Sequence, residues 1–257
     1  MNESQSKHEP IPVLYRDDDL VIVSKPSGLA VHRGWARDSV TLLSQLKRQL
    51  GLRLHPVHRL DRGTSGALLL AVHAEAARVL QEALQAPDAA KVYLALVRGI
   101  APDNGYIDHA IAKSKQHEKR EAYTAFERLA TFERYSLVRA RPYTGRLHQV
   151  RRHLKFISLP LIGDTRYGKG EHNRLYRERF DAHRLVLHAA QLRLRPRANE
   201  PLLSLRATLP EELERLFARI GVLEAARAAV AGPIWDPDVS GFQRFEDAPT
   251  PGQATTA

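Results

Sequence analysis

The order of apolar and polar positions along the chain predicts a mixture of β-strands and α-helices. Alternating or β-branched apolar residues predict strands, of which the first two form a hairpin: Val13–Tyr15 with Leu20–Val23, Lys91–Gly99, Tyr135–Pro142 and Arg184–Leu192. Apolar residues at helical spacing predict helices over Thr41–Leu50, Ala74–Gln85, Leu147–Leu154 and Pro210–Ile220. No linker separates these elements, so we predict one body that spans residues 11–222.

A further apolar run, Ala67–Val72, directly follows a segment with a Thr–Ser pair and two glycines. This order predicts a tight loop that leads the chain into a buried strand. Asp61 lies in that loop, at the mouth of the strand, between Arg59 and Arg62. Two interpretations stay open at this point: a structural ion pair that closes the loop, or a reactive carboxylate that its neighbours keep ionised.

Two other residues stand out on predicted core elements. In the strand at 91–99, alternation places Tyr93 on one face, where a tyrosine either packs with its hydroxyl satisfied or takes part in chemistry. In the helix at 147–154, Arg151 lies on the same side as the apolar residues and therefore needs an anionic partner. The chain thus contains a carboxylate in one segment and a core-facing arginine in another.

The ends of the chain differ from the body. We predict that residues 1–10 are flexible, because they are polar, and that residues 223–257 form a tail rich in Pro and Thr that is partly docked or disordered. The aromatic residues Trp235, Phe242 and Phe245 favour docking of part of this tail. The charged insert at 111–121 is predicted to be a solvated loop.

Charge narrows the possible partners. The 257 residues include 39 Lys and Arg and 29 Asp and Glu, a net charge of +10, which is typical of proteins that meet nucleic acid or an acidic membrane surface. Between Arg141 and Arg197 there are 14 basic and 4 acidic residues, and 14 minus 4 is again +10. The absence of cysteine excludes disulfides, zinc–thiolate sites and thiol nucleophiles. Without a signal peptide or membrane span in the sequence, a cytoplasmic location is expected.

Several sequence motifs resemble those of the RluA-type pseudouridine synthases. They are KPSG at 25–28, HRLDRGTSG at 58–66, KVYLALVRG at 91–99 and TGRLHQVRRHL at 144–154. The resemblance extends from about Val13 to Ile220. It implies an α+β fold in which a mixed, largely antiparallel sheet with peripheral helices holds a central catalytic cleft.

The resemblance also implies roles for individual residues. Asp61 occupies the position of the catalytic aspartate, Tyr93 lies against it for stacking or proton transfer, and Arg151 pairs with it. Asp61 could add either to the base or to the ribose carbon. Arg59 could fill the space that a flipped uridine leaves. Further RNA contacts are expected from the remaining polar residues of these motifs: His58, Arg62, Arg146, His148 and Arg152.

Three functions remain open from the sequence. The chain could be a synthase that modifies a uridine in the acceptor-side region of tRNA, the same enzyme acting on ribosomal RNA, or a catalytically silent RNA-binding protein. The isomerisation needs no redox change and no external group, so no cofactor is implied, and the sequence has no Gly-rich phosphate loop. His148 and His153 share a helix without a third ligand, so no metal site is predicted. We expect a monomer whose partner is RNA, with tRNA favoured.

Overall fold

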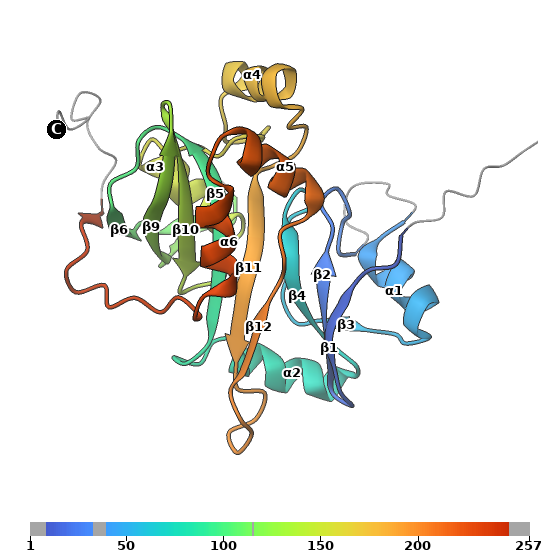
Figure 1. Ribbon diagram of the computed structural model, residues 1–257. Helices are drawn as coiled ribbons and strands as arrows, with labels where there is room; N and C mark the ends of the chain where they lie inside the picture. The colour runs from blue at the N-terminus through green and yellow to red at the C-terminus, as the bar shows by residue number, and fades with distance from the viewer. Residues whose placement is uncertain (1–8, 33–39, 115, 247–257) are drawn as a thin grey trace, which may run out of the picture.

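The computed structural model describes residues 9–32, 40–114 and 116–246. Most of the predicted flexible N-terminus, and the part of the predicted tail beyond residue 246, lie outside the described residues. Within these ranges one large sheet runs through the body and helices pack on both of its faces (Figure 1).

The sheet is mixed and largely antiparallel, as expected. Its strands lie in the order β1-β2-β4-β11-β5-β10-β9-β6-β13, with β3 paired to β4 and β12 paired to β11. The pairs β4–β11 and β6–β13 are parallel. The strands of this sheet are β1 Val13–Arg16, β2 Leu20–Lys25, β3 His55–Pro56, β4 Ser65–Ala71, β5 Ala90–Arg98, β6 Asn104–Asp108, β9 Tyr123–Phe132, β10 Tyr135–Pro142, β11 Leu187–Leu194, β12 Leu203–Arg206 and β13 Arg244–Phe245.

The helices begin and end where local chemistry favours it. In α1, the Thr41 side chain accepts the backbone N–H of Ser44, and Gly51 ends the helix in the left-handed region at φ 71°. The helix bounds are α1 Leu42–Leu50, α2 Ala74–Ala83, α3 Gln149–Phe156, α4 Gly170–Phe180, α5 Glu211–Arg219 and α6 Leu223–Ala231. No helix within the described ranges is long and apolar enough to cross a bilayer.

Strand β5 shows how the core is divided between the two faces of the sheet. Leu94 and Leu96 pack in the cluster that α4, α5 and α6 cover, whereas Ala95 and Val97 pack in the cluster that α3 covers. The predicted alternation is therefore confirmed. Tyr93 packs against the cluster on the α3 face, which is behind the sheet in Figure 1.

Strand β4 is buried along its whole length, which confirms the strand predicted after the Asp61 loop. It lies between β2 and β11, and a buried leucine of such a strand contributes roughly 1.5–3 kcal/mol. Gly66 is required where β4 meets β11 in parallel. It has φ 113°, and a Cβ atom there would lie 2.2 Å from the carbonyl oxygen of Ala189.

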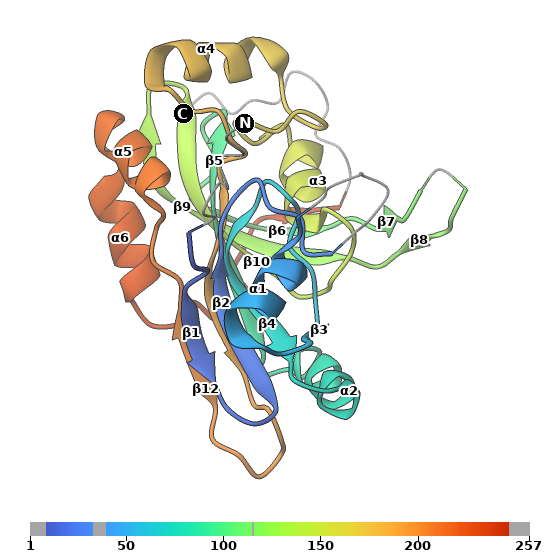
Figure 2. The ribbon, with the colours of Figure 1, turned by 90° about the vertical axis from the view of Figure 1, so that its right-hand side faces the viewer.

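Two segments differ in detail from the sequence prediction. The insert at 111–121 is not simply a solvated loop: Ile111 is buried, and β7 Ile111–Ala112 pairs with β8 Lys119–Arg120 in a hairpin that projects from the body (Figure 2). After residue 222 the chain forms α6 on α5, and Trp235 is buried against Val92 and Ala125. The Gln191 side chain holds the segment at 229–235: its Nε2 donates to backbone carbonyls there, and its Oε1 accepts the N–H of Trp235 at 3.0 Å.

Candidate active site

Asp61 lies in the loop between β3 and β4, and its side chain is 16% exposed. The N–H of Thr64 donates to the Asp61 carbonyl at 3.0 Å, which closes the turn, while the neighbouring Leu60 is buried in the core. The loop packs tightly, since a Cβ atom on Gly63 would lie 3.1 Å from Leu185. The half-buried carboxylate is therefore positioned by a backbone that is fixed on both sides.

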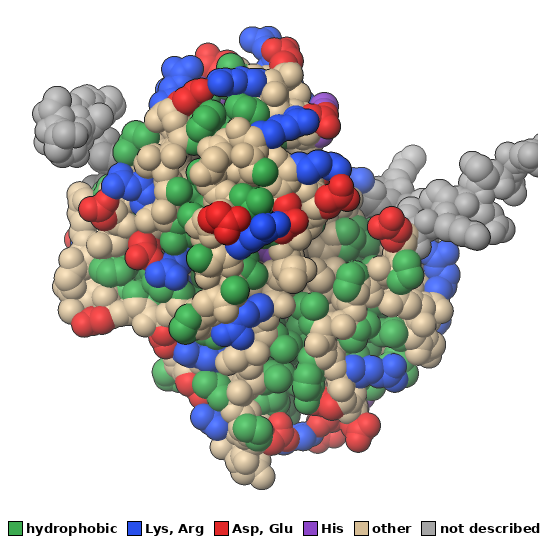
Figure 3. Space-filling view, in the orientation of Figure 1, with side chains coloured by type: hydrophobic (Ala, Val, Ile, Leu, Met, Phe, Trp, Pro, Cys, Tyr) green, Lys and Arg blue, Asp and Glu red, His purple; other side chains and the backbone are tan. Residues whose placement is uncertain are grey.

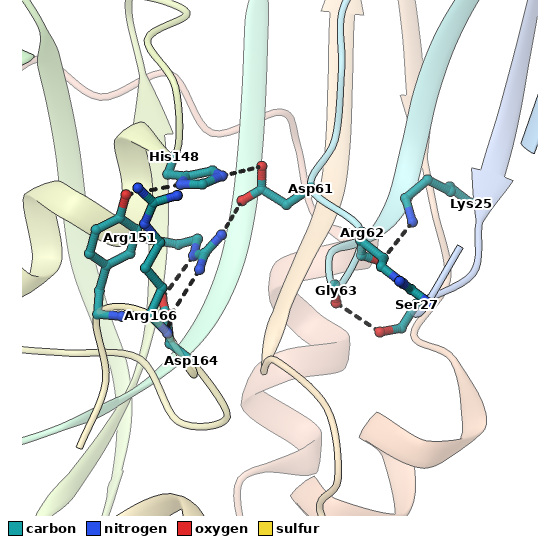
Figure 4. A network of polar contacts seen from close by, with 10 residues as sticks. Lys25, Ser27, Asp61, Arg62, Gly63, His148, Arg151, Asp164 and Arg166 are labelled. Atoms are coloured by element: carbon teal, nitrogen blue, oxygen red, sulfur yellow. Dashed lines mark hydrogen bonds and ion pairs between the residues drawn. The ribbon is translucent and has the colours of Figure 1, made fainter. Parts of the chain in front are cut away.

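The KPSG turn supports this loop from the side opposite Arg151 (Figure 4). Lys25 is 1% exposed, and its Nζ donates to the carbonyls of Pro26 and Leu29 at 2.7 Å and of Arg62 at 3.2 Å. Ser27 Oγ donates to the carbonyl of Gly63 at 2.8 Å. Burial, together with the charge of a nearby arginine, lowers the pKa of Lys25 to about 7.

Arg151 joins two carboxylates that are distant in the sequence (Figure 4). Its NH1 donates to Asp61 Oδ2 at 2.7 Å, across 90 residues of chain. Its Nε and NH2 donate to the two oxygens of Asp164, both at 2.8 Å, in the bidentate geometry that guanidinium and carboxylate groups favour. The pairing of Asp61 with Arg151 that the sequence analysis expected is present, and Asp164 completes it.

Asp164 is placed by a tight turn after α3. Gly163 takes φ 76°, and a Cβ atom there would lie 1.9 Å from the carbonyl oxygen of Arg184, so only glycine fits. Asp164 Oδ1 also accepts the backbone N–H groups of Arg166 and Tyr167, each at 2.9 Å. Its side chain has no exposed surface. The turn therefore holds the carboxylate by contacts that do not involve Arg151.

The charges of this group stabilise one another. Burial opposes ionisation of Arg151 and Asp164, but their mutual hydrogen bonds outweigh it, so the pKa of Arg151 is raised and that of Asp164 is lowered. At Tyr93, burial and the negative charge of Asp61 both raise the pKa. The Tyr93 hydroxyl therefore remains protonated at neutral pH. It lies close enough to Asp61 for the charge of the carboxylate to raise its pKa.

The family model described as RNA pseudouridylate synthase matches residues 19–156. A tRNA pseudouridine synthase C of Vibrio parahaemolyticus serotype O3:K6 is 37% identical over 233 residues, 81% of this chain and 94% of that protein. This chain belongs to the RNA pseudouridylate synthase family. It is an isomerase that converts uridine in RNA to pseudouridine, and the RluA-type resemblance is confirmed.

Other relatives agree with this assignment. A tRNA pseudouridine synthase C of Vibrio cholerae is 36% identical over 239 residues, which cover 84% of this chain and 98% of that protein. The structure of human RNA Pseudouridylate Synthase Domain Containing 4 is similar with a TM-score of 0.67 and 28% identity, over 82% of this chain and 93% of the other. Human RNA Pseudouridylate Synthase Domain Containing 1, at 24% identity and a TM-score of 0.63, shares the fold over 92% of this chain and 100% of its own.

Among the residues selected from the sequence of this synthase, only some lie at the carboxylate. His148 Nε2 is 3.5 Å from Asp61 Oδ1, and the charge of Arg59 is one of those that act on His148. Four others bind backbone groups elsewhere: His58 Nε2 accepts the N–H of Leu69, and Arg62, Arg146 and Arg152 donate to the carbonyls of Gly28, Glu121 and Ala112. Their intramolecular contacts fix the loops that surround the site.

Asp164 and Tyr167, in the turn after α3, were not among the residues that the sequence motifs selected. One signal was available, since a guanidinium has five N–H donors and a single carboxylate cannot satisfy a buried one. Asp164 and Asp61 both lie next to apolar segments of the sequence: Asp164 follows Leu159–Ile162, and Asp61 precedes the strand at 67–72. Among the described residues there is no group of three or more His, Asp or Glu side chains placed to bind a metal ion.

Proposed function

We propose that this synthase modifies a uridine in the acceptor-side region of tRNA. The proposal is supported by relatives named tRNA pseudouridine synthase C, which match nearly their whole length at 36–37% identity. Recognition would depend on RNA shape and on an exposed nucleotide, because bases in an A-form helix are poorly accessible from the major groove.

In the proposed reaction Asp61 is the nucleophile. The bond from the ribose C1′ to N1 of the base breaks, the base turns, and C1′ bonds to C5. The C5 proton leaves and N1 gains a proton, so atoms and charges balance without a co-reactant. Asp61 would carry either the base or the ribose while the base turns, and both routes need an ionised carboxylate. The observation that carries this assignment is the bond of 2.7 Å from Arg151 to Asp61.

Tyr93 and Arg59 would serve the flipped nucleotide. Because the pKa of Tyr93 is raised, its side chain offers an aromatic face and an O–H group rather than a phenolate base. Arg59 is exposed beside Asp61 and could occupy the gap left in the RNA stack. Neither role requires a metal or an organic cofactor.

The test is modification of purified RNAs by the purified protein. Transcripts of tRNA and of ribosomal RNA are incubated with wild type and with Asp61→Asn, and pseudouridine is mapped at single-nucleotide resolution. We expect one modified position in the acceptor-side half of tRNA with wild type and none with Asp61→Asn, although the variant still binds RNA. Modification of ribosomal RNA alone would contradict the tRNA substrate, and an active Asp61→Asn protein would contradict the nucleophile.

A further inference from the structure

The carboxylate of Asp61 has a neighbour on each oxygen. Arg151 NH1 binds Oδ2 at 2.7 Å, and His148 Nε2 lies 3.5 Å from Oδ1 (Figure 4). The side chains of His148 and Asp61 are 14% and 16% exposed, so little water competes for this contact. A separation of 3.5 Å is long for a hydrogen bond, but such bonds often shorten when the substrate closes the site.

The backbone of His148 takes an uncommon conformation that serves this contact. The residue precedes α3 with φ 54° and ψ 32°, in the left-handed region that non-glycine residues seldom adopt. It occupies the N-cap position, yet its side chain makes no capping hydrogen bond to α3. The imidazole is therefore available to groups outside the helix, and Figure 4 shows it directed toward Asp61.

The Tyr167 hydroxyl is placed to support one of the two neutral tautomers of the His148 ring. The tyrosine hydroxyl lies 3.0 Å from His148 Nδ1, and the two rings meet edge-on with centroids 5.6 Å apart. If the hydroxyl donates to Nδ1, the neutral imidazole presents Nε2–H to Asp61. The other tautomer would direct the Nε2 lone pair at the carboxylate, which is unfavourable, so the contact with Asp61 selects the first arrangement.

Tyr167 is itself positioned by the ion pair at the centre of the site. Its backbone N–H donates to Asp164 Oδ1 at 2.9 Å, and the guanidinium carbon of Arg151 lies 5.1 Å from the centre of its ring. The same turn that anchors Arg151 therefore also places the hydroxyl that orients His148. Both neighbours of Asp61 depend on Asp164.

The charges around His148 favour a neutral imidazole. Burial lowers its pKa, Asp61 acts in the opposite direction, and the positive charges of Arg151, Arg166 and Arg59 lower it again. A neutral Nε2–H orients the carboxylate without placing a second full positive charge beside a nucleophile. Arg151 already supplies the one cation that keeps Asp61 ionised.

We propose that Tyr167 and His148 form a positioning relay for Asp61, a role that rests on the proposed nucleophile. The Tyr167 hydroxyl holds the His148 tautomer, and His148 Nε2–H holds Oδ1 so that the carboxylate plane faces the uridine. Both are positioning residues, since they act through Asp61. This assigns to His148 a role different from the RNA contact expected from its motif.

The test compares variants that differ in where a donor lies. His148→Gln keeps a neutral N–H near the place of Nε2, whereas His148→Asn tolerates the left-handed backbone but is too short to reach Asp61. We expect kcat to fall about 100-fold in His148→Asn and His148→Ala, and less than about tenfold in His148→Gln, with KM for RNA within about threefold throughout. His148→Asn is the matched control, because any loss there does not come from backbone strain.

A double-mutant cycle isolates the link to Tyr167. Tyr167→Phe should lower kcat about tenfold in the wild-type background but less than about twofold in His148→Gln, because the glutamine has no tautomer to select. Equal effects in both backgrounds would overturn the relay, as would a His148→Asn enzyme with wild-type kcat or a change confined to KM. All assays use whichever RNA the wild type modifies, so an incorrect tRNA assignment leaves this test intact. An active Asp61→Asn protein would show separately that Asp61 is not the nucleophile.

Discussion

Asp164 is the residue whose loss should show how much the site depends on its buried ion pair. In Asp164→Asn, one carboxylate oxygen that accepts from Arg151 becomes an NH₂ group, and the negative charge is removed from a side chain with no exposed surface. Breaking a buried pair by removing one partner costs about 3–5 kcal/mol. Because Arg151 keeps its bond to Asp61, we take the lower end, about 3 kcal/mol.

For a chain of this size, each kcal/mol corresponds to about 2–4 °C in Tm, so Asp164→Asn should melt about 6–12 °C below the wild type. Thermal and urea unfolding, followed by circular dichroism, measure this change. The matched control is Asp103→Asn, since Asp103 also pairs with an arginine but its side chain is 83% exposed. That variant should stay within about 1 kcal/mol of the wild type.

The pH dependence of the stability difference between wild type and Asp164→Asn tests whether the charge of Asp164 causes that difference. Hydrogen bonds from Arg151 lower the folded-state pKa of Asp164 below its ordinary value of 3.8. The stability that this charge contributes is therefore complete above that value and is lost as the pH falls through the lowered pKa. The difference between wild type and Asp164→Asn should shrink on acidification in that range. If Asp164→Asn melts within 2 °C of the wild type at neutral pH, the pair has no such role in stability.

Three further outcomes follow from the site and the charge distribution. Tyr93→Phe should lower single-turnover rates about 100-fold and leave RNA affinity within about twofold, because it removes only the O–H group; an unchanged rate would leave stacking as the whole role. Lys25→Met should melt at a lower temperature than the wild type. The folded-state pKa of Lys25, about 7, lies below its ordinary value of 10.5, so the folded protein binds fewer protons than the unfolded chain between these pH values and the wild type gains stability as the pH rises. Lys25→Met should lack that gain. RNA affinity should fall about tenfold or more between roughly 50 and 200 mM salt, as binding titrations can show, and affinity independent of salt would contradict a basic RNA surface.

The structure indicates which face of the protein carries the basic RNA-binding surface. On the face shown in Figure 3, where α5 and α6 lie, Lys and Arg side chains are interspersed with Asp and Glu side chains. A mixed surface of this kind attracts phosphate weakly. We therefore expect salt-sensitive substitutions to lie on the α3 face, where Asp61 and Arg151 are found, rather than on the face in Figure 3.

The local order of the fold could be predicted because periodicity reports burial directly. Strand β10 has the predicted bounds, Tyr135–Pro142, and the fully buried β4 follows the Asp61 loop. The helix α4 was missed because only a few of its residues, such as Tyr176 and Phe180, are apolar and buried. The contact of β4 with β11 joins Ser65 to His188, 123 residues apart, and no local pattern specifies a partner at that distance.

The pairing of Asp61 with Arg151 was expected from the resemblance to the RluA-type motifs, and the need of a buried arginine for an anionic partner agreed with it. Asp164 was not predicted because a carboxylate in a Gly–Asp turn looks the same in sequence whether it faces water or a guanidinium. The physical clue is the number of N–H donors on Arg151, because the carboxylate of Asp61 alone could accept only some of the five N–H groups of the guanidinium. Reading a buried arginine by its donor count rather than by its charge would have indicated a second acid.

This division of Arg151 between two acids bears on the chemistry of the proposed nucleophile. Asp164 takes two of the three bonds from the guanidinium to carboxylates, and Asp61 takes one. In the proposed reaction Asp61 would lose its negative charge on forming a covalent bond, and an arginine paired with Asp61 alone would then be a buried, uncompensated cation. Because Asp164 would remain ionised, Arg151 would stay neutralised, and the proposed covalent intermediate would avoid the penalty of several kcal/mol that such a cation incurs.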